Sequence, residues 1–180
     1  PHHAVLYGRY DDLASLPGQN HYFIEPTRTA YKFQPGNVNY ELAYGCIGIN
    51  EYLVELARRS GATLKDERAA LRSAFDLITE QEERVCRILI DYLQSRDGVK
   101  IIGETTADAA IRVPTVSFVT KNGQHSDIVG VIDRFNIGIR YGDFYARRLA
   151  DHLGLDPVQG VIRVSMVHYN TPGEVDRLVE

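Results

Sequence analysis

The chain has 180 residues, 44% of them hydrophobic and 24% charged, which suits a globular protein of one domain or slightly more. Its net charge of −4 comes without a basic run, which argues against nucleic acid or an anionic membrane as the main partner. No apolar run approaches the ~20 residues of a membrane-spanning helix, and no signal peptide is visible.

The first third of the chain is predicted to be a strand, a loop and a helix. Residues 4–9 form a short apolar run ended by glycine and charges, which predicts a buried strand. Residues 11–39 contain Pro-Gly pairs and no sustained period, which predicts a long loop. Residues 40–59 follow a helical period, and glycines within this helix favour close packing against a neighbour.

A long helix is predicted next, over residues 64–95. Thr63 is the expected N-cap, with Asp66 in the acidic first turn. Apolar residues follow the 3.6-residue period to the end of the segment. About thirty residues at 1.5 Å each give ~45 Å, a length typical of a helix that bridges two domains.

The remainder, from residue 98, alternates short strands and short helices. Strands are predicted at 99–102, 115–119, 137–140 and 161–166, and helices at 126–135, 145–153 and 174–180. Thr171, Pro172 and Glu174 have the spacing of a capping box before the last helix. These elements predict the α+β class, with a small, mostly antiparallel sheet covered by helices on one face.

Two arginines stand out among residues that could carry chemistry. Arg163 is expected in the middle of a strand between apolar neighbours, and Arg140 at the end of the preceding strand. Each could pair with a carboxylate at the sheet edge, because a desolvated cation needs a partner. Alternatively, the two could form a fork for an anionic ligand, since guanidinium matches a carboxylate in bidentate geometry. Composition and periodicity leave both possibilities open.

Other reactive residue types carry weaker signals. Cys46 and Cys86 are too few for a disulfide scaffold and lack metal-ligand spacing, so we expect buried thiols and a reducing, cytoplasmic compartment. His2 and His3 are adjacent, so on a strand they would point to opposite faces, and no metal site is expected.

Four blocks of the chain together resemble one enzyme family. They are residues 1–8, 32–39, 137–142 and 163–178. The last, Arg163-Val-Ser-Met-Val-His-Tyr-Asn-Thr-Pro-Gly-Glu, is similar to the C-terminal signature of the cysteine desulfurase and selenocysteine lyase family. These class V aminotransferase-like enzymes have fold type I and use pyridoxal 5'-phosphate (PLP).

The resemblance implies that the chain is the C-terminal part of such an enzyme. Residues 1–63 would be the tail of the PLP-binding large domain, 64–97 the connecting helix, and 98–180 the small domain. The catalytic Schiff-base lysine is expected upstream of Pro1, and none of the chain's four lysines stands in a matching context. We therefore expect the chain alone to be inactive and to bind no PLP.

The resemblance also implies roles for individual residues. Arg163 matches the arginine that holds the substrate's α-carboxylate, and Arg140 matches a second active-site arginine. Gly36 and Asn37 match the loop that reaches the PLP phosphate of the partner subunit, where the family usually has Gly-Thr. Tyr145 stands where desulfurases have their persulfide-forming cysteine. Because a phenol cannot form a persulfide, an aminotransferase, lyase or epimerase fits better than an ordinary desulfurase.

The sequence thus predicts part of a cytoplasmic PLP enzyme that acts on a small amino acid. A homodimer is expected, because the family shares its active site between subunits, and neither nucleic acid nor membrane is an expected partner. The alternative is a non-catalytic module for dimerisation or docking, derived from a truncated family member.

Overall fold

The computed structural model describes residues 3–19, 21–34, 36–61, 63, 65–121 and 124–180. The chain divides into two compact units, Pro1–Leu71 and Arg72–Glu180, and each is described by itself. Within the described ranges, no helix combines the length and apolar character needed to cross a membrane. Pro1 and His2 of the first family-like block, and Leu64 of the predicted long helix, lie outside them.

The first unit contains helix α1 (Tyr10–Ser15), a 3₁₀ turn η1 (Tyr31–Phe33) and helix α2 (Tyr40–Arg59). Helix α2 confirms the prediction for residues 40–59. The strand predicted at 4–9 is wrong, because the described residues there form no strand and most are exposed. A strand needs a neighbour for its backbone ladder, and the described part of this unit offers none. The predicted loop 11–39 is also interrupted, by α1 and η1.

Lys32 explains why the segment after α1 is ordered. Its side chain is buried, with 6% of the residue exposed. The ammonium donates hydrogen bonds to the carbonyl oxygens of Ala14, at 2.8 Å, and Leu16, at 2.6 Å. These bonds satisfy the buried cation and tie η1 to the end of α1.

Helix α2 begins with a side-chain cap and has a largely open surface. The Asn39 carbonyl oxygen accepts from the Leu42 N–H at 2.8 Å, the usual N-cap geometry. Ala57 is the buried residue of this helix. Gly45 and Gly48 face open space, so the close packing predicted from these glycines is wrong within this unit.

Helix α3 (Glu67–Gln94) is the long helix predicted from residue 64. Its cap differs from the prediction: the Asp66 carboxylate, rather than Thr63, accepts the Ala69 N–H at 2.7 Å. Asp66 therefore takes the N-cap position, and the helix begins at Glu67. The helix starts in the first unit and continues through the second, where a stripe of its side chains enters the core.

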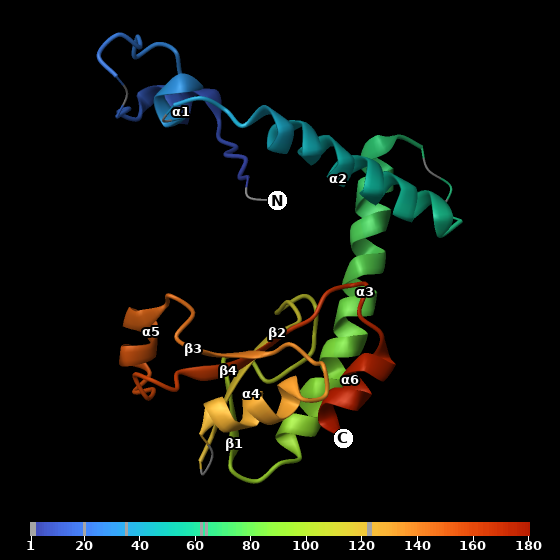
Figure 1. Cartoon of the computed structure of the whole chain (residues 1–180). Helices are drawn as coiled ribbons and strands as arrows, with labels where there is room; N and C mark the ends of the chain where they lie inside the picture. Colours follow the sequence, from blue (N-terminus) through green and yellow to red (C-terminus); the bar gives the residue numbers. More distant parts are fainter. Residues whose placement is uncertain (1–2, 20, 35, 62, 64, 122–123) are drawn as a thin grey trace. The chain divides into compact units, whose positions relative to one another are not determined.

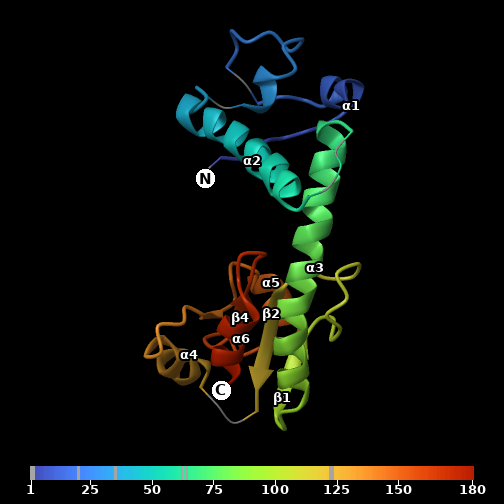
Figure 2. The same cartoon turned by 90° about the vertical axis from the view of Figure 1, so that its right-hand side faces the viewer.

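The second unit is an antiparallel sheet with helices (Figures 1 and 2). The sheet has the order β1-β2-β4-β3, and all three pairings are antiparallel, as predicted. The strands are β1 (Val99–Ile102), β2 (Thr115–Thr120), β3 (Arg140–Gly142) and β4 (Val161–Ser165), and the remaining helices are α4 (His125–Asp133), α5 (Arg147–His152) and α6 (Pro172–Val179).

The core lies on one face of this sheet. Alternating residues of β2 and β4, such as Val116 and Ile162, are fully buried against α3, α4 and α6. The intervening residues, including Ser117 and Arg163, project from the opposite, more polar face. The predicted fold class, a small antiparallel sheet with helices on one face, is confirmed.

Several element boundaries around this sheet differ from the predictions. The strand predicted at 137–140 begins instead at Arg140, because Ile137 and Ile139 pack into the core without joining the ladder. Helix α4 starts one residue early, at His125, and ends at Asp133. Helix α5 starts at Arg147 and not at Tyr145, whose positive φ of 62° is incompatible with a right-handed helix.

The predicted capping box at α6 is confirmed. The Thr171 hydroxyl accepts from the Glu174 N–H at 3.3 Å, and the Glu174 carboxylate accepts from the Thr171 N–H at 2.6 Å. These bonds to Thr171 hold the pKa of the Glu174 carboxyl below its usual value. Ionised Glu174 therefore stabilises the folded state above the ordinary carboxyl pKa. This stabilisation is lost as the pH falls through the lowered pKa of the folded state.

We expect Thr171→Ala to lower the free energy of unfolding by about 1 kcal/mol at neutral pH, as loss of an N-cap does. The difference from the parent chain should shrink in acid, when Glu174 is protonated. Urea unfolding at a series of pH values measures both effects. Thr79→Ala, at an exposed position within α3, is the control. An equal loss in both variants would contradict the assignment.

Candidate anion-binding site on the open sheet face

Arg163 stands at the centre of the polar sheet face. It belongs to β4, the strand that pairs with β2 on one side and β3 on the other. Its direct neighbours across these strands are Ser117 and Arg140. Because residues paired across a sheet project from the same face, the strand register places two arginines and a serine in one row. Two cations side by side create a positive potential that favours an anion.

The Arg163 side chain has an aromatic partner and, in the part of the chain that the structure describes, no counter-charge. Its guanidinium carbon lies 3.7 Å from the centroid of the Phe144 ring, a cation–π contact. Among the residues that the structure describes, no carboxylate or carbonyl oxygen accepts from this guanidinium. The residue is nevertheless half-buried. A partly desolvated cation with free N–H groups is an arrangement that a bound anion would stabilise.

Arg140 differs from Arg163 in both exposure and partners. Its guanidinium donates to the Asp133 carboxylate, at 3.4 Å, and to the backbone carbonyl of Ile139, at 2.6 Å. Its side chain is 67% exposed. Pairing with a carboxylate at the sheet edge therefore describes Arg140, whereas Arg163 has no such partner in the described chain.

The loop after β3 carries the aromatic ring that covers Arg163. The Asp143 carboxylate accepts from the Tyr145 N–H at 3.0 Å, and its carbonyl accepts from the Ala146 N–H at 2.8 Å. Phe144 and Tyr145 both have positive φ, at 51° and 62°. Consecutive non-glycine residues in the left-handed region are strained, and such strain persists only where the surroundings hold it.

Two glycines hold this loop against the start of β4. Gly142 and Gly160 form a parallel bridge. A Cβ on Gly160 would lie 2.2 Å from the backbone carbon and oxygen of Gly142, and the φ of Gly160 is 54°. Only glycine permits so close a backbone approach together with this conformation. The contact anchors the strained turn one residue before Asp143.

The structure places Tyr145 beside this site, with a fully exposed side chain. The two cysteines belong to different units and differ in their surroundings. Cys86 is buried in the core, and burial raises the pKa of its thiol, although Arg112 and Arg87 partly oppose this. Cys46 is half-buried in the first unit, with its thiol directed at the Leu42 carbonyl.

Gly36 and Asn37 belong to the first unit, separately from the arginines. Both residues are exposed. Gly36 has a φ of 93° with open space at its α-carbon, and its carbonyl accepts from the Gln34 side-chain amide at 3.1 Å. Their backbone is thus accessible.

A PLP site also needs a lysine amine, and the chain's four lysines stand in different surroundings. The Lys32 amine is committed to two backbone carbonyls. Lys100 is on β1, the edge strand farthest from β3, while Lys65 and Lys121 are exposed. The paired arginines therefore suit a carboxylate, while the Lys32 amine is already occupied by its two carbonyl acceptors.

Sequence reasoning missed three residues of this site, namely Ser117, Phe144 and Gly160. Ser117 could have been found, because strand alternation places it on the polar face with Thr115. Phe144 and Gly160 carry no such signal, since their importance depends on a turn that brings distant residues together.

Comparisons with known proteins identify the family of this chain. A profile of the family "Aminotransferase class-V" matches residues 68–178. The chain is 34% identical, over 99% of its length, to "Aminotransferase-like protein FGM3" of Gibberella zeae, and it covers 41% of that protein. It is 30% identical, over 97% of its length, to "Cysteine desulfurase-like protein ustD" of Aspergillus flavus, covering 37% of it.

The chain is thus well under half as long as these curated relatives. Among solved structures, it resembles the apo cysteine desulfurase of Thermococcus onnurineus, with a TM-score of 0.53 and 23% sequence identity. That match covers 63% of this chain and 27% of the other. At this identity, the likeness concerns the fold.

Proposed function

Because the chain belongs to the class-V aminotransferase family, we propose that it is the C-terminal part of a PLP-dependent enzyme acting on an amino acid. The observation that carries the proposal is the guanidinium of Arg163, half-buried, stacked on Phe144 and without an anionic partner in the described chain. In this proposal Arg163 binds the α-carboxylate of the substrate through two parallel N–H···O bonds.

The other residues of the site have supporting roles in the proposal. Arg140 sets the positive potential beside Arg163 and releases Asp133 when it turns toward the substrate. Tyr145, fully exposed, borders the substrate on the solvent side. Gly36 and Asn37 reach the cofactor phosphate of the partner subunit in a homodimer. When Arg163 holds the carboxylate, the substrate's amino group is held in a defined position as well. The reaction then proceeds from an oriented complex and needs no productive random encounter.

PLP, when bound, supplies the electron sink for reactions at the α-carbon of an amino acid. Its lysine is proposed to precede Pro1 in a longer protein, so the 180-residue chain alone is inactive. Residues 1–63 form the tail of the cofactor-binding domain, 64–97 the connecting helix and 98–180 the small domain. The division of the two compact units at Leu71, within that helix, supports this assignment.

The reaction class follows from the missing thiol. Sulfur transfer from cysteine needs a thiolate at the position of Tyr145, and a phenol does not form a persulfide. Cys86 is buried in the core with a raised pKa. Transamination, elimination or epimerisation of an amino acid in the cytoplasm therefore fits better than persulfide formation. A non-catalytic docking module is less well supported, since docking requires no unpaired, half-buried arginine.

The test compares the full-length protein with the 180-residue chain. The full-length protein is expected to show the visible absorption band of lysine-bound PLP, and peptide mapping after borohydride reduction should place the cofactor on a lysine before Pro1. The 180-residue chain, titrated with PLP, should give no such specific label. A specific label on Lys32, Lys65, Lys100 or Lys121 of the full-length protein would overturn the proposal, as would a reading frame that starts just upstream of Pro1.

A further inference from the structure

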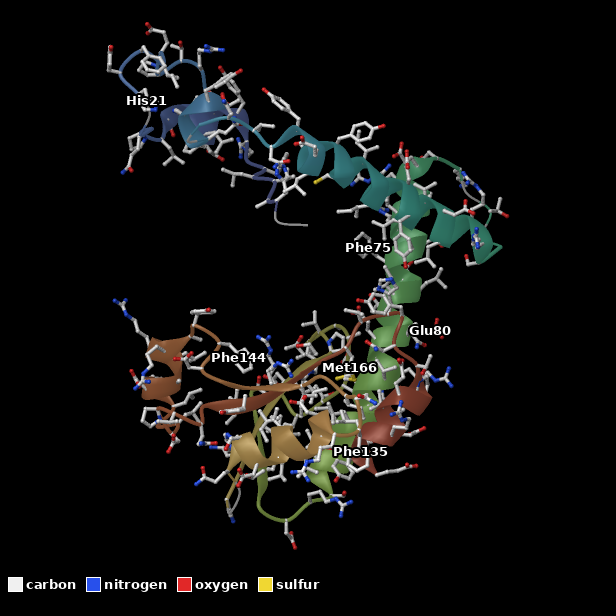
Figure 3. The ribbon with its side chains drawn as sticks, viewed as in Figure 1. His21, Phe75, Glu80, Phe135, Phe144 and Met166 are labelled. Carbon is white, nitrogen blue, oxygen red and sulfur yellow. The ribbon has the colours of Figure 1, made fainter. Side chains whose placement is uncertain are left out.

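The guanidinium of Arg163 lies over an aromatic ring, and its N–H groups have no acceptor among the described residues. The Phe144 ring lies 3.7 Å from the guanidinium carbon. Figure 3 shows Phe144 on the side of β3 and β4 away from helix α4, where the polar sheet face lies. A ring stacked on the flat face leaves the in-plane N–H groups available, and these are the groups that bind a carboxylate.

The backbone around Phe144 is built to hold the ring there. Its φ of 51° and that of Tyr145 direct the two adjacent aromatic side chains differently: Phe144 is half-buried and Tyr145 is fully exposed. The Asp143 hydrogen bonds close the turn, and the bridge between Gly142 and Gly160 fixes its base. Several independent contacts thus determine a conformation that costs free energy by itself.

We propose that Phe144 is a positioning residue that holds the Arg163 guanidinium in the orientation that receives the substrate carboxylate. This inference rests on the proposed function of Arg163. An arginine side chain with no partner samples several rotamers, and ordering it on binding weakens the affinity. Stacking on a held aromatic ring restricts those rotamers in advance while leaving the N–H edge free.

The two neighbouring arginines, Arg140 and Arg163, are oriented by partners of different kinds. Arg140 is oriented by a carboxylate, Asp133, which competes with any anionic ligand. Arg163 is oriented by an aromatic ring, which offers no negative charge and so does not compete. A receptor for a carboxylate benefits from the second kind of support, because orientation is gained without neutralising the cation.

The test follows the Nε–Hε NMR signal of Arg163 in the 180-residue chain, assigned through Arg163→Lys, during titration with sodium acetate against sodium chloride. The Phe144 ring current should shift this signal upfield in the parent chain. In Phe144→Leu the upfield shift should disappear and acetate should bind about three- to tenfold more weakly. Phe144→Tyr should restore both properties, whereas Phe135→Leu, at an exposed phenylalanine after α4, should match the parent.

The outcomes separate this inference from the proposed function. If acetate moves the Arg163 signal equally in the parent and Phe144→Leu, the positioning role is wrong and carboxylate binding stands. If acetate leaves the signal unmoved in the parent, the proposed function falls, and the inference with it. Should the isolated chain give a poorly dispersed spectrum, crystal structures of the full-length protein decide. Phe144→Leu should then leave Arg163 in several rotamers, and a single unchanged rotamer overturns the inference.

Discussion

Arg163→Met in the full-length protein is expected to weaken the binding of amino-acid substrates by about tenfold to 150-fold. A hydrogen bond to a charged group contributes roughly 1.5–3 kcal/mol, and every 1.4 kcal/mol corresponds to about tenfold in affinity. Methionine keeps much of the apolar stem, so the sheet should remain intact. The dissociation constant of the amino acid, read from the spectrum of the bound cofactor, measures the effect.

Two further arginine variants are the controls for this result. Arg140→Met should have a smaller effect, because its guanidinium already donates to Asp133 and Ile139. Arg148→Met, at an exposed position in α5, should leave the affinity unchanged. If Arg163→Met bound amino acids as tightly as Arg148→Met, the assignment of the carboxylate site to Arg163 would be wrong.

Gly160→Ala is expected to destabilise the second unit by about 2–5 kcal/mol. The new Cβ would lie 2.2 Å from two backbone atoms of Gly142 and 2.7 Å from the backbone nitrogen of Asp143, so the backbone must move. An overpacked site costs about 1–3 kcal/mol, and the positive φ of 54° adds about 1–2 kcal/mol for a residue with a Cβ. Chemical denaturation gives the free energy of unfolding.

Substitutions at other glycines of the same unit distinguish the cost of steric overlap from the cost of the positive φ. Gly154 has a φ of 66° with open space around it, so Gly154→Ala should show the conformational cost alone. Gly138 has open space and no positive φ, so Gly138→Ala should be neutral or slightly stabilising. If Gly160→Ala were no worse than Gly154→Ala, the close backbone approach would not be the cause of the loss.

Local signals in the sequence were enough for several elements. The helical period of residues 40–59 predicted α2 with both ends correct. Strong alternation predicted β4, and the spacing of Thr171 and Glu174 predicted the cap of α6. In each case the determining residues are close in the chain, so that period, alternation and capping chemistry act without help from distant segments.

Predictions failed where the outcome depends on distant partners. An apolar run such as residues 4–9 becomes a strand only beside another strand, and the described part of its unit contains none. The apolar residues Ile137 and Ile139 pack into the core and take no part in the strand ladder, so β3 begins at Arg140. The Phe144 ring contacts Arg163 because of a strained turn and a close contact between two glycines. No local sequence pattern predicts either feature.

A crystal structure of the full-length protein with a bound amino acid tests the central claim most directly. We expect the α-carboxylate to accept two hydrogen bonds of about 2.7–2.9 Å from the in-plane N–H groups of Arg163, with the Phe144 ring still stacked behind it. A carboxylate bound away from Arg163, with that guanidinium paired instead to an acidic side chain of the protein, would contradict the account.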